Sequence, residues 1–200
     1  QWLGAARGSR HAVYIIVGTG IGAGILVDGK PYKGNVVAGA IGWMLLGEEF
    51  MDRTYDKGCL ESFASGPNIT LRAVEATRKG AETIMLDMVR GKADRITSEI
   101  IFEAARKGDK LALDIVKKTA RYLGIAISNI VSILGPDIVV LGGGVGEASD
   151  LLLDDIKGIV NSYTQPYAAK TVKIVPSALG RNAPALGVAK LVFNNLQTIP

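Results

Sequence analysis

The chain has 200 residues, of which 48% are hydrophobic, 21% are charged and 25 are glycine. This length and composition suit one compact folded unit and exclude a chain that is disordered throughout. The formal net charge is +4, and Lys and Arg form no dense run, so we expect no direct binding to nucleic acid. Cys59 is the only cysteine, which excludes an internal disulfide and fits a reducing compartment. No apolar run is long enough to span a membrane, and we expect a cytoplasmic protein without membrane contact.

The first part of the chain predicts a small antiparallel sheet. Residues 12–17 form a short apolar run rich in β-branched side chains, which is typical of a buried strand. Residues 25–27 form a second run that ends at the turn signal Asp28-Gly29. A short strand over residues 30–33 would complete the meander.

The rest of the chain predicts helices, then alternating strands and helices. Residues 110–134 predict one long helix with an apolar second half, and Pro136 ends it. The other predicted elements are helices at 68–79 and 99–107, a strand at 137–141, a helix at 149–163, a strand at 171–175 and a helix at 182–196. Strand–helix–strand spacing of this kind implies parallel pairing with right-handed crossovers. We therefore expect a single α/β domain over residues 1–200, with a mixed sheet of about five strands in βββ-α-β-α-β-α order and helices on both faces.

Glycine recurs at every second residue between the first two predicted strands, beginning with Gly18-Thr19-Gly20. On extended backbone this period leaves one face without side chains, so that a ligand can approach the main chain closely. A tight turn with exposed N–H groups, together with the Thr19 hydroxyl, suits a phosphate group. The alternative is a glycine-rich hairpin without a ligand, because short glycine motifs often match by chance.

A second glycine cluster, Gly142-Gly143-Gly144-Val145, follows directly after the strand predicted at 137–141. Ligands of α/β sheets bind beyond the carboxyl ends of the strands, where glycine lets a phosphate or a flat ring lie on the backbone. The alternative is an ordinary strand-to-helix turn. Neither cluster has the G-x-G-x-x-G spacing of a dinucleotide site, and the chain has no P-loop, so both of those sites are disfavoured.

Five segments occur in an order that resembles the ROK family of sugar kinases and transcriptional repressors. They are residues 18–22 with 27–30, 38–43, 58–66, 136–145 and 178–187. The resemblance covers nearly the whole chain and implies the C-terminal lobe of an actin-like ATPase, which has a ribonuclease H-like fold. It also implies that ATP, with or without Mg²⁺, binds at Gly18, Thr19, Gly20, Gly142, Gly143, Gly144 and Val145, and that the protein forms a homo-oligomer, usually a dimer.

The chain departs from the family where the resemblance implies a sugar site and a zinc site. Ala40 and Trp43 stand where the family has a glutamate that contacts sugar and a histidine that binds sugar and zinc. Alanine offers no acceptor and indole cannot ligate zinc. Cys59 has no cysteine partner at 52–56, so we predict no zinc and no other metal. Glu61 remains of the sugar-binding set; its carboxylate either accepts hydrogen bonds from sugar hydroxyls or is a solvated glutamate in a first helical turn. We expect the apolar run that begins at Trp43 to lie in the core.

These observations leave more than one function open. The family's first phosphate loop and catalytic aspartate correspond to sequence before Gln1, so we expect this chain to lack the N-terminal lobe and not to transfer a phosphoryl group alone. One hypothesis is the nucleotide- and sugar-binding lobe of a glucokinase-like sugar kinase. The alternative is the effector-sensing and dimerisation domain of a ROK repressor without kinase activity, and a third is a degenerate relative that keeps the fold for assembly. The glycine clusters favour the first, whereas Ala40 and Trp43 argue against ordinary hexose phosphorylation.

Overall fold

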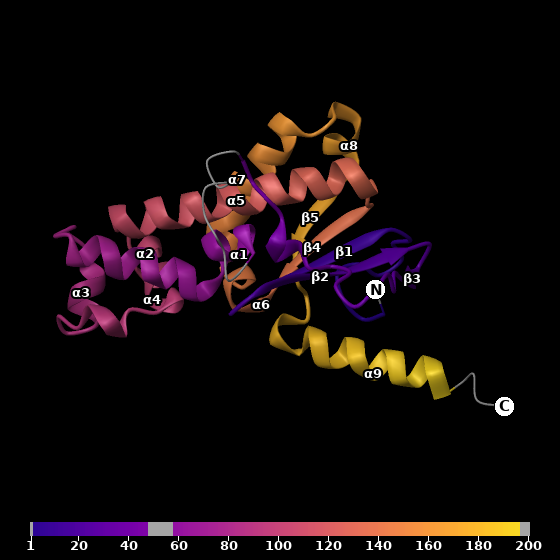
Figure 1. Ribbon diagram of the computed structural model, residues 1–200, viewed down its shortest axis with the longest axis horizontal. Helices are drawn as coiled ribbons and strands as arrows, with labels where there is room; N and C mark the ends of the chain where they lie inside the picture. Colours follow the sequence, from indigo (N-terminus) through magenta and orange to yellow (C-terminus); the bar gives the residue numbers. More distant parts are fainter. Residues whose placement is uncertain (1, 48–57, 197–200) are drawn as a thin grey trace.

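A five-stranded mixed sheet forms the centre of the computed structural model, which describes residues 2–47 and 58–196. Its strands are β1 (Ala12–Val17), β2 (Ile21–Val27), β3 (Lys30–Pro31), β4 (Ile138–Gly142) and β5 (Lys173–Pro176), in the order β3-β2-β1-β4-β5. The first three strands are antiparallel, and β4 is parallel to both β1 and β5. The predicted α/β fold is thus confirmed (Figure 1). The expectation for residues 52–56 lies outside the described residues.

The α-helices form two groups along the chain: α1 to α5 come between β3 and β4, and α6 to α9 come after β4. The α-helices are α1 (Cys59–Ala64), α2 (Gly66–Arg78), α3 (Ile84–Met88), α4 (Ser98–Arg106), α5 (Lys110–Leu134), α6 (Gly143–Gly146), α7 (Ser149–Tyr163), α8 (Pro166–Thr171) and α9 (Ala183–Leu196). Short 3₁₀ turns are η1 (Ile41–Trp43), η3 (Ala93–Arg95) and η4 (Gly180–Asn182). The helices α1 to α4 lie beyond one end of the sheet, and α5 runs from them across the sheet (Figure 1). None of the described helices is long and apolar enough to cross a membrane.

The long helix α5 has clear signals at both ends. The Asp109 side chain accepts a hydrogen bond of 2.8 Å from the Ala112 N–H, which satisfies one of the free donors of the first turn. Gly135 ends the helix at φ 51°, in the left-handed conformation that glycine adopts readily. Both bounds of α5 agree with the sequence prediction. The sequence did not predict α3, α6 or α8, which are short.

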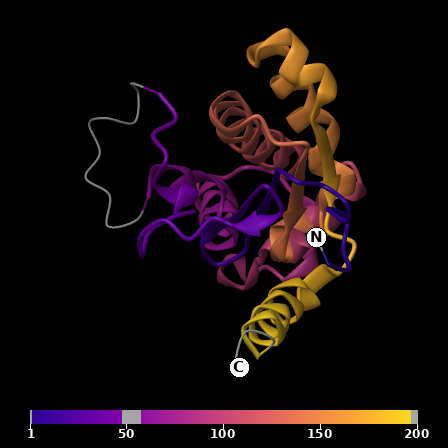
Figure 2. The ribbon, with the colours of Figure 1, turned by 90° about the vertical axis from the view of Figure 1, so that its right-hand side faces the viewer.

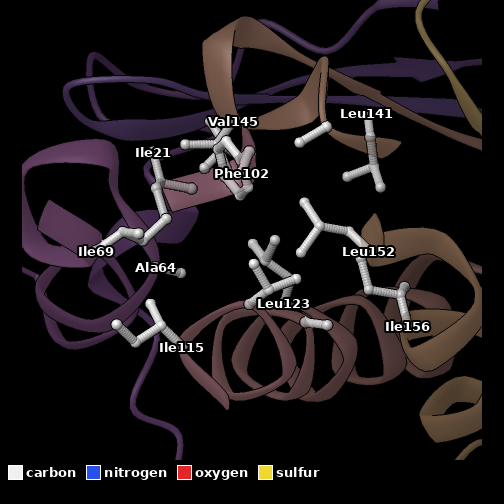
Figure 3. Packing of buried hydrophobic residues seen from close by; sticks show 14 of the residues in the cluster. Ile21, Ala64, Ile69, Phe102, Ile115, Leu123, Leu141, Val145, Leu152 and Ile156 are labelled. Atoms are coloured by element: carbon white, nitrogen blue, oxygen red, sulfur yellow. The ribbon is translucent and has the colours of Figure 1, made fainter. Parts of the chain in front are cut away.

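The two faces of the sheet are buried differently. Alternate residues of β1 and β4, such as Ile15 and Leu141, point into the main core under α5 and α7. Figure 3 shows this core, in which Leu123 of α5 and Leu152 of α7 meet the sheet. The opposite residues form a smaller cluster of Ala6, Ala12, Ile138 and Val140. This second face looks toward α9, so helices lie on both sides of the sheet, and the main core lies on the side of α5 and α7.

Candidate functional site

The first glycine cluster forms the turn between β1 and β2. Gly18 N–H donates a hydrogen bond of 2.9 Å to the Gly20 carbonyl, which closes the turn, and Val17 pairs with Ile21 in the ladder. The Gly18 carbonyl accepts a 2.8 Å hydrogen bond from the N–H of Gly66, at the start of α2. Thr19 and Gly20 are exposed at the tip. The turn is therefore held at its base, with its outermost peptide groups open to solvent.

The second glycine cluster lies directly against the end of β1. Gly143 begins α6 at φ 83°, and a Cβ atom there would overlap the Val17 carbonyl and lie 2.8 Å from the Val17 nitrogen. Val145, in the same turn of helix, is only 1% exposed and packs in the main core. The buried valine and the close backbone approach together fix α6 beside the β1–β2 turn. The two clusters, more than 120 residues apart in sequence, thus meet at the carboxyl ends of β1 and β4, which are parallel neighbours.

The glycines of this site differ in what surrounds them. A Cβ on Gly142 would overlap the Tyr14 hydroxyl, and a Cβ on Gly20 would lie 2.9 Å from Glu61 Oε2. These two glycines, like Gly143, are explained by contacts within the protein. In contrast, a Cβ on Gly18 or Gly144 would meet no described atom within 4 Å. Their open side is where a ligand could approach the main chain. We refer to residues 18–20 and 142–145 as the glycine site.

Glu61 connects the glycine site to the segment before α1. It lies in the first turn of α1, and its Oε2 accepts a hydrogen bond of 2.9 Å from the N–H of Ile21. The same oxygen lies 3.2 Å from the position of a Cβ on Gly42 in η1. Neither sequence interpretation of Glu61 described this role, because both assumed a carboxylate without a protein partner. One oxygen of this carboxylate holds the first residue of β2, and Oε1 is the atom that could contact a ligand.

Trp43 and Ala40, the departures from the family pattern, flank the same segment. Ala40 is exposed, and Trp43 is 63% exposed at the end of η1. The expectation that the run beginning at Trp43 lies in the core is wrong for Trp43 and also for Leu45, which is 51% exposed. The expectation is confirmed for the other two residues of the run, Met44 and Leu46, which pack against the core. An exposed indole therefore stands one residue away from Gly42 and its contact with Glu61.

Sequence reasoning missed the polar groups on the other side of the glycine site. Ser98 begins α4, and its Oγ lies 3.7 Å from the position of a Cβ on Gly66. Arg181, in η4, donates from Nε to both Glu147 oxygens at 3.1 and 3.3 Å, next to the end of α6. The pKa of Glu99 is held below its usual range, first by its own backbone N–H and in smaller part by the Arg181 charge. The sequence signals were Thr97-Ser98 at the start of α4 and Arg181 after Gly180, but only the fold brings these residues to the glycine site.

The described residues offer no metal centre. No group of three or more His, Cys, Asp or Glu side chains in the part of the chain that the structure describes could hold a metal ion. Cys59 is buried as a free thiol at the start of α1. The absence of zinc stays a prediction, which metal analysis of the purified chain would check.

Known proteins resemble this chain in sequence along most of its length. A sequence profile described as the ROK family matches residues 1–195. This chain belongs to the ROK family. A glucokinase from Halalkalibacterium halodurans is 36% identical over 195 residues, which are 96% of this chain and 59% of that protein. A xylose repressor from Bacillus spizizenii is 28% identical and matches 98% of this chain and 47% of its own length.

Solved structures agree with this assignment. The ROK glucokinase from Streptomyces griseus, crystallised with glucose and AMPPNP, superposes with a TM-score of 0.82 at 28% identity, covering 94% of this chain and 62% of that protein. This ROK chain spans about three-fifths of the length of the glucokinases it matches. The resemblance stated from the sequence motifs is thereby confirmed, and so is the actin-like fold.

Proposed function

We propose that this chain is the nucleotide- and sugar-binding lobe of a ROK sugar kinase. The observation that carries the proposal is the meeting of the two glycine clusters at the carboxyl ends of β1 and β4, with Gly18 and Gly144 open to a ligand. This is the place where α/β sheets bind phosphates. The similarity to a glucokinase that binds glucose and AMPPNP supports ATP as the nucleotide.

Each part of the glycine site has a role in this proposal. Backbone N–H groups of the exposed turn at Thr19 and Gly20, with the Thr19 hydroxyl, would donate to phosphate oxygens from one side. The N–H of Gly144, in the first turn of α6, would donate from the other side. Gly142 and Gly143 shape this contact, and Val145 anchors α6 through the core. When bound, ATP would supply the phosphoryl group, and Mg²⁺ would offset part of its charge.

Glu61 is the candidate sugar contact. Its Oε1 would accept hydrogen bonds from sugar hydroxyls while Oε2 remains bound to the Ile21 N–H. Ala40 adds no acceptor beside it, and the exposed Trp43 adds an aromatic face instead. We therefore expect ordinary hexoses to bind weakly to this chain.

A titration tests the nucleotide proposal. Isothermal titration of the purified chain with ATP and ADP in the presence of Mg²⁺ should show binding that Gly144→Val abolishes. Gly158→Val in α7 is the matched control, because Gly158 is also helical, exposed and without a described atom within 4 Å of its Cβ position. No heat of binding with either nucleotide, or equal loss in both variants, would refute the proposal.

A second function is favoured by one further observation, the similarity to xylose repressors along nearly the whole chain. In that case the chain would sense a sugar effector without kinase activity, and Trp43 and Ala40 would reflect the changed sugar site. Binding of sugar in the absence of any nucleotide binding would select this alternative.

Four finer expectations belong to the same proposal. We expect no phosphoryl transfer from ATP to glucose by these 200 residues alone, which a coupled kinase assay tests. We also expect a homodimer, to be checked by light scattering. A protein that uses ATP and a sugar would act in the cytoplasm, and nothing in the charge pattern favours nucleic-acid contact by this chain.

A further inference from the structure

The segment that follows η1 presents two apolar side chains to solvent. Trp43 is 63% exposed and Leu45 is 51% exposed, whereas Met44 and Leu46 pack against the main core. Met44 is extended, at φ −60° and ψ 128°, and side chains on extended backbone point alternately to opposite sides. Trp43 and Leu45 therefore lie on the same outer side, and we refer to these two side chains as the Trp43 shelf. Figure 2 shows the end of this purple segment on the left of the molecule, away from the orange α7 and α8 and the yellow α9.

The backbone under the Trp43 shelf is held from two sides. The Trp43 N–H donates a hydrogen bond of 3.1 Å to the Ala40 carbonyl. The Met44 carbonyl accepts a hydrogen bond of 3.2 Å from the N–H of Leu60 in α1. A Cβ on Gly58, just before α1, would lie 2.6 Å from the Trp43 Cα, so the two segments approach as closely as glycine allows. The indole is thus exposed on a fixed backbone, and a ring with few torsions loses little entropy when a ligand covers it.

The Trp43 shelf continues the candidate sugar site. A Cβ on Gly42 would lie 2.7 Å from the Ile21 carbonyl and 3.2 Å from Glu61 Oε2, and Trp43 is the next residue of the chain. Ile21 follows the turn of the glycine site and donates its N–H to the same Glu61 oxygen. The contacts therefore lead from the glycine site through Glu61 and Gly42 to the indole. A sugar held at Glu61 would have the glycine site on one side and the Trp43 shelf on the other.

The chemistry and the length of the Trp43 shelf select a class of sugar. Leucine has no polar group and indole has only one N–H donor, so neither side chain replaces an acceptor for sugar hydroxyls. Both favour an apolar ring face laid against them. Two residues of extended backbone span about 7 Å, so the shelf reaches beyond a single ring bound at Glu61. The exposed Ala40 in the same turn has a small side chain, which leaves space for a second ring.

We propose that the sugar ligand of this chain is a glycoside, in which the anomeric carbon joins the sugar to a second ring. The hydroxyls of the first ring bind Glu61, and the second ring stacks on the Trp43 shelf. This inference rests on the proposed function, because it needs a sugar at Glu61. It applies equally to the lobe of a kinase and to a domain that senses a sugar, since both must bind the ligand.

A titration compares ligands that differ only in the group on the anomeric carbon. Isothermal titration of the chain uses methyl glucoside and phenyl glucoside, each as both anomers. We expect one phenyl anomer to bind at least about tenfold more tightly than the matching methyl glucoside, which corresponds to about 1.4 kcal/mol. Burial of roughly 55 Å² of apolar surface supplies this difference. Equal affinities would overturn this inference alone, and no binding of any glucoside would overturn the sugar part of the proposed function as well.

A third ligand identifies the second ring. Cellobiose carries a second sugar ring in place of the phenyl ring. Affinity equal to that of phenyl glucoside would identify a disaccharide as the ligand, whereas affinity equal to that of methyl glucoside would identify an aryl glycoside.

Variants assign the preference to Trp43. Trp43→Ala should bind phenyl and methyl glucoside equally, with its affinity for methyl glucoside unchanged, and Trp43→Phe should keep most of the preference because it keeps an aromatic face. Trp2→Ala is the matched control, since Trp2 is the only other tryptophan and is 45% exposed. It should bind both glucosides as the wild type does. A full preference in Trp43→Ala, or loss of both ligands in Trp43→Phe, would overturn the inference.

The fluorescence of the indole measures the contact directly. In Trp2→Ala all tryptophan emission comes from Trp43. Phenyl glucoside should shift this emission to shorter wavelength, because the second ring displaces water from the indole, and methyl glucoside should leave it unchanged. Dilution of the protein without ligand should also leave it unchanged. A shift on dilution would show that a second copy of the chain covers the Trp43 shelf, and would overturn the inference.

Discussion

Gly143 and Gly144 are neighbours in the glycine site, yet the structure predicts opposite effects of replacing them by alanine. Gly143 has φ 83°, which costs an L-residue about 1–2 kcal/mol. Its new Cβ would also overlap the Val17 carbonyl, and forcing backbone apart in a packed region costs about 1–3 kcal/mol. The expected loss of stability for Gly143→Ala is therefore about 2–5 kcal/mol.

Gly144→Ala has neither penalty. Gly144 has no positive φ and no described atom within 4 Å of its Cβ position. Within a helical turn, alanine is more stable than glycine by about 0.5–1 kcal/mol. The two variants should thus differ by at least about 2.5 kcal/mol, which for a chain of this size corresponds to a difference of roughly 5–10 °C in melting temperature.

Thermal unfolding followed by circular dichroism measures this difference, with both variants and the wild type at the same pH and concentration. Gly143→Ala should melt well below the wild type, and Gly144→Ala at or slightly above it. If Gly143→Ala melts within about 2 °C of the wild type, α6 does not approach Val17 as closely as described. The reasoning that separates structural glycines from ligand-facing ones would then be wrong.

Three further predictions test other contacts. Glu61→Ala should lower stability by about 1–3 kcal/mol in urea unfolding, because the buried Ile21 N–H loses its acceptor, and Glu61→Gln should recover most of that loss through its side-chain carbonyl. Gly124→Ala should lower the free energy of unfolding by about 1–3 kcal/mol, because its Cβ would lie 2.9 Å from the Ile159 Cβ where α5 and α7 pack. An unchanged melting curve would mean that the two helices can move apart without cost. The pKa of Asp137 is lowered, first by the His11 backbone N–H, so its ionised form adds stability above the unfolded value of 3.8 and loses it as the pH falls through the lower folded value. Asp137→Asn should therefore be less stable than wild type at neutral pH and approach it in acid, and a constant difference across the pH titration would contradict this.

Elements with strong local signals were predictable from the sequence. The bounds of α5 follow from the Asp109 cap and from Gly135 in the left-handed conformation, both of which act within a few residues of the helix. The strands β1 and β4 follow from uninterrupted apolar runs. Short elements such as α8, at Pro166–Thr171, were missed because fewer than two turns of helix are too short to show a hydrophobic periodicity.

The contacts that define the site were not predictable in the same way. The sequence predicts Gly142 as a ligand-binding glycine but not that a Cβ there would overlap the Tyr14 hydroxyl, a contact that depends on the parallel register of β1 and β4. Trp43 was expected in the core because apolar runs usually are, and η1 turned it outward instead. The surroundings of α9 were also not predictable. An amphipathic helix would have shown which face packs on the sheet, but the apolar residues of α9 lie all round it and predict burial on every side.

Glu61 shows how these contacts could couple the two proposed ligands. Because Oε2 is bound to the Ile21 N–H, a sugar that hydrogen-bonds to Oε1 would fix the carboxylate and, through it, the β1–β2 hairpin whose turn begins at Gly18. Ordering of that hairpin would lower the entropy cost of placing a phosphate on its N–H groups. Nucleotide and sugar would then bind with positive cooperativity, and the coupling would disappear in Glu61→Ala even if each ligand alone still bound. In the proposed function this carboxylate, and not the glycine clusters alone, would therefore couple the nucleotide site to the sugar site.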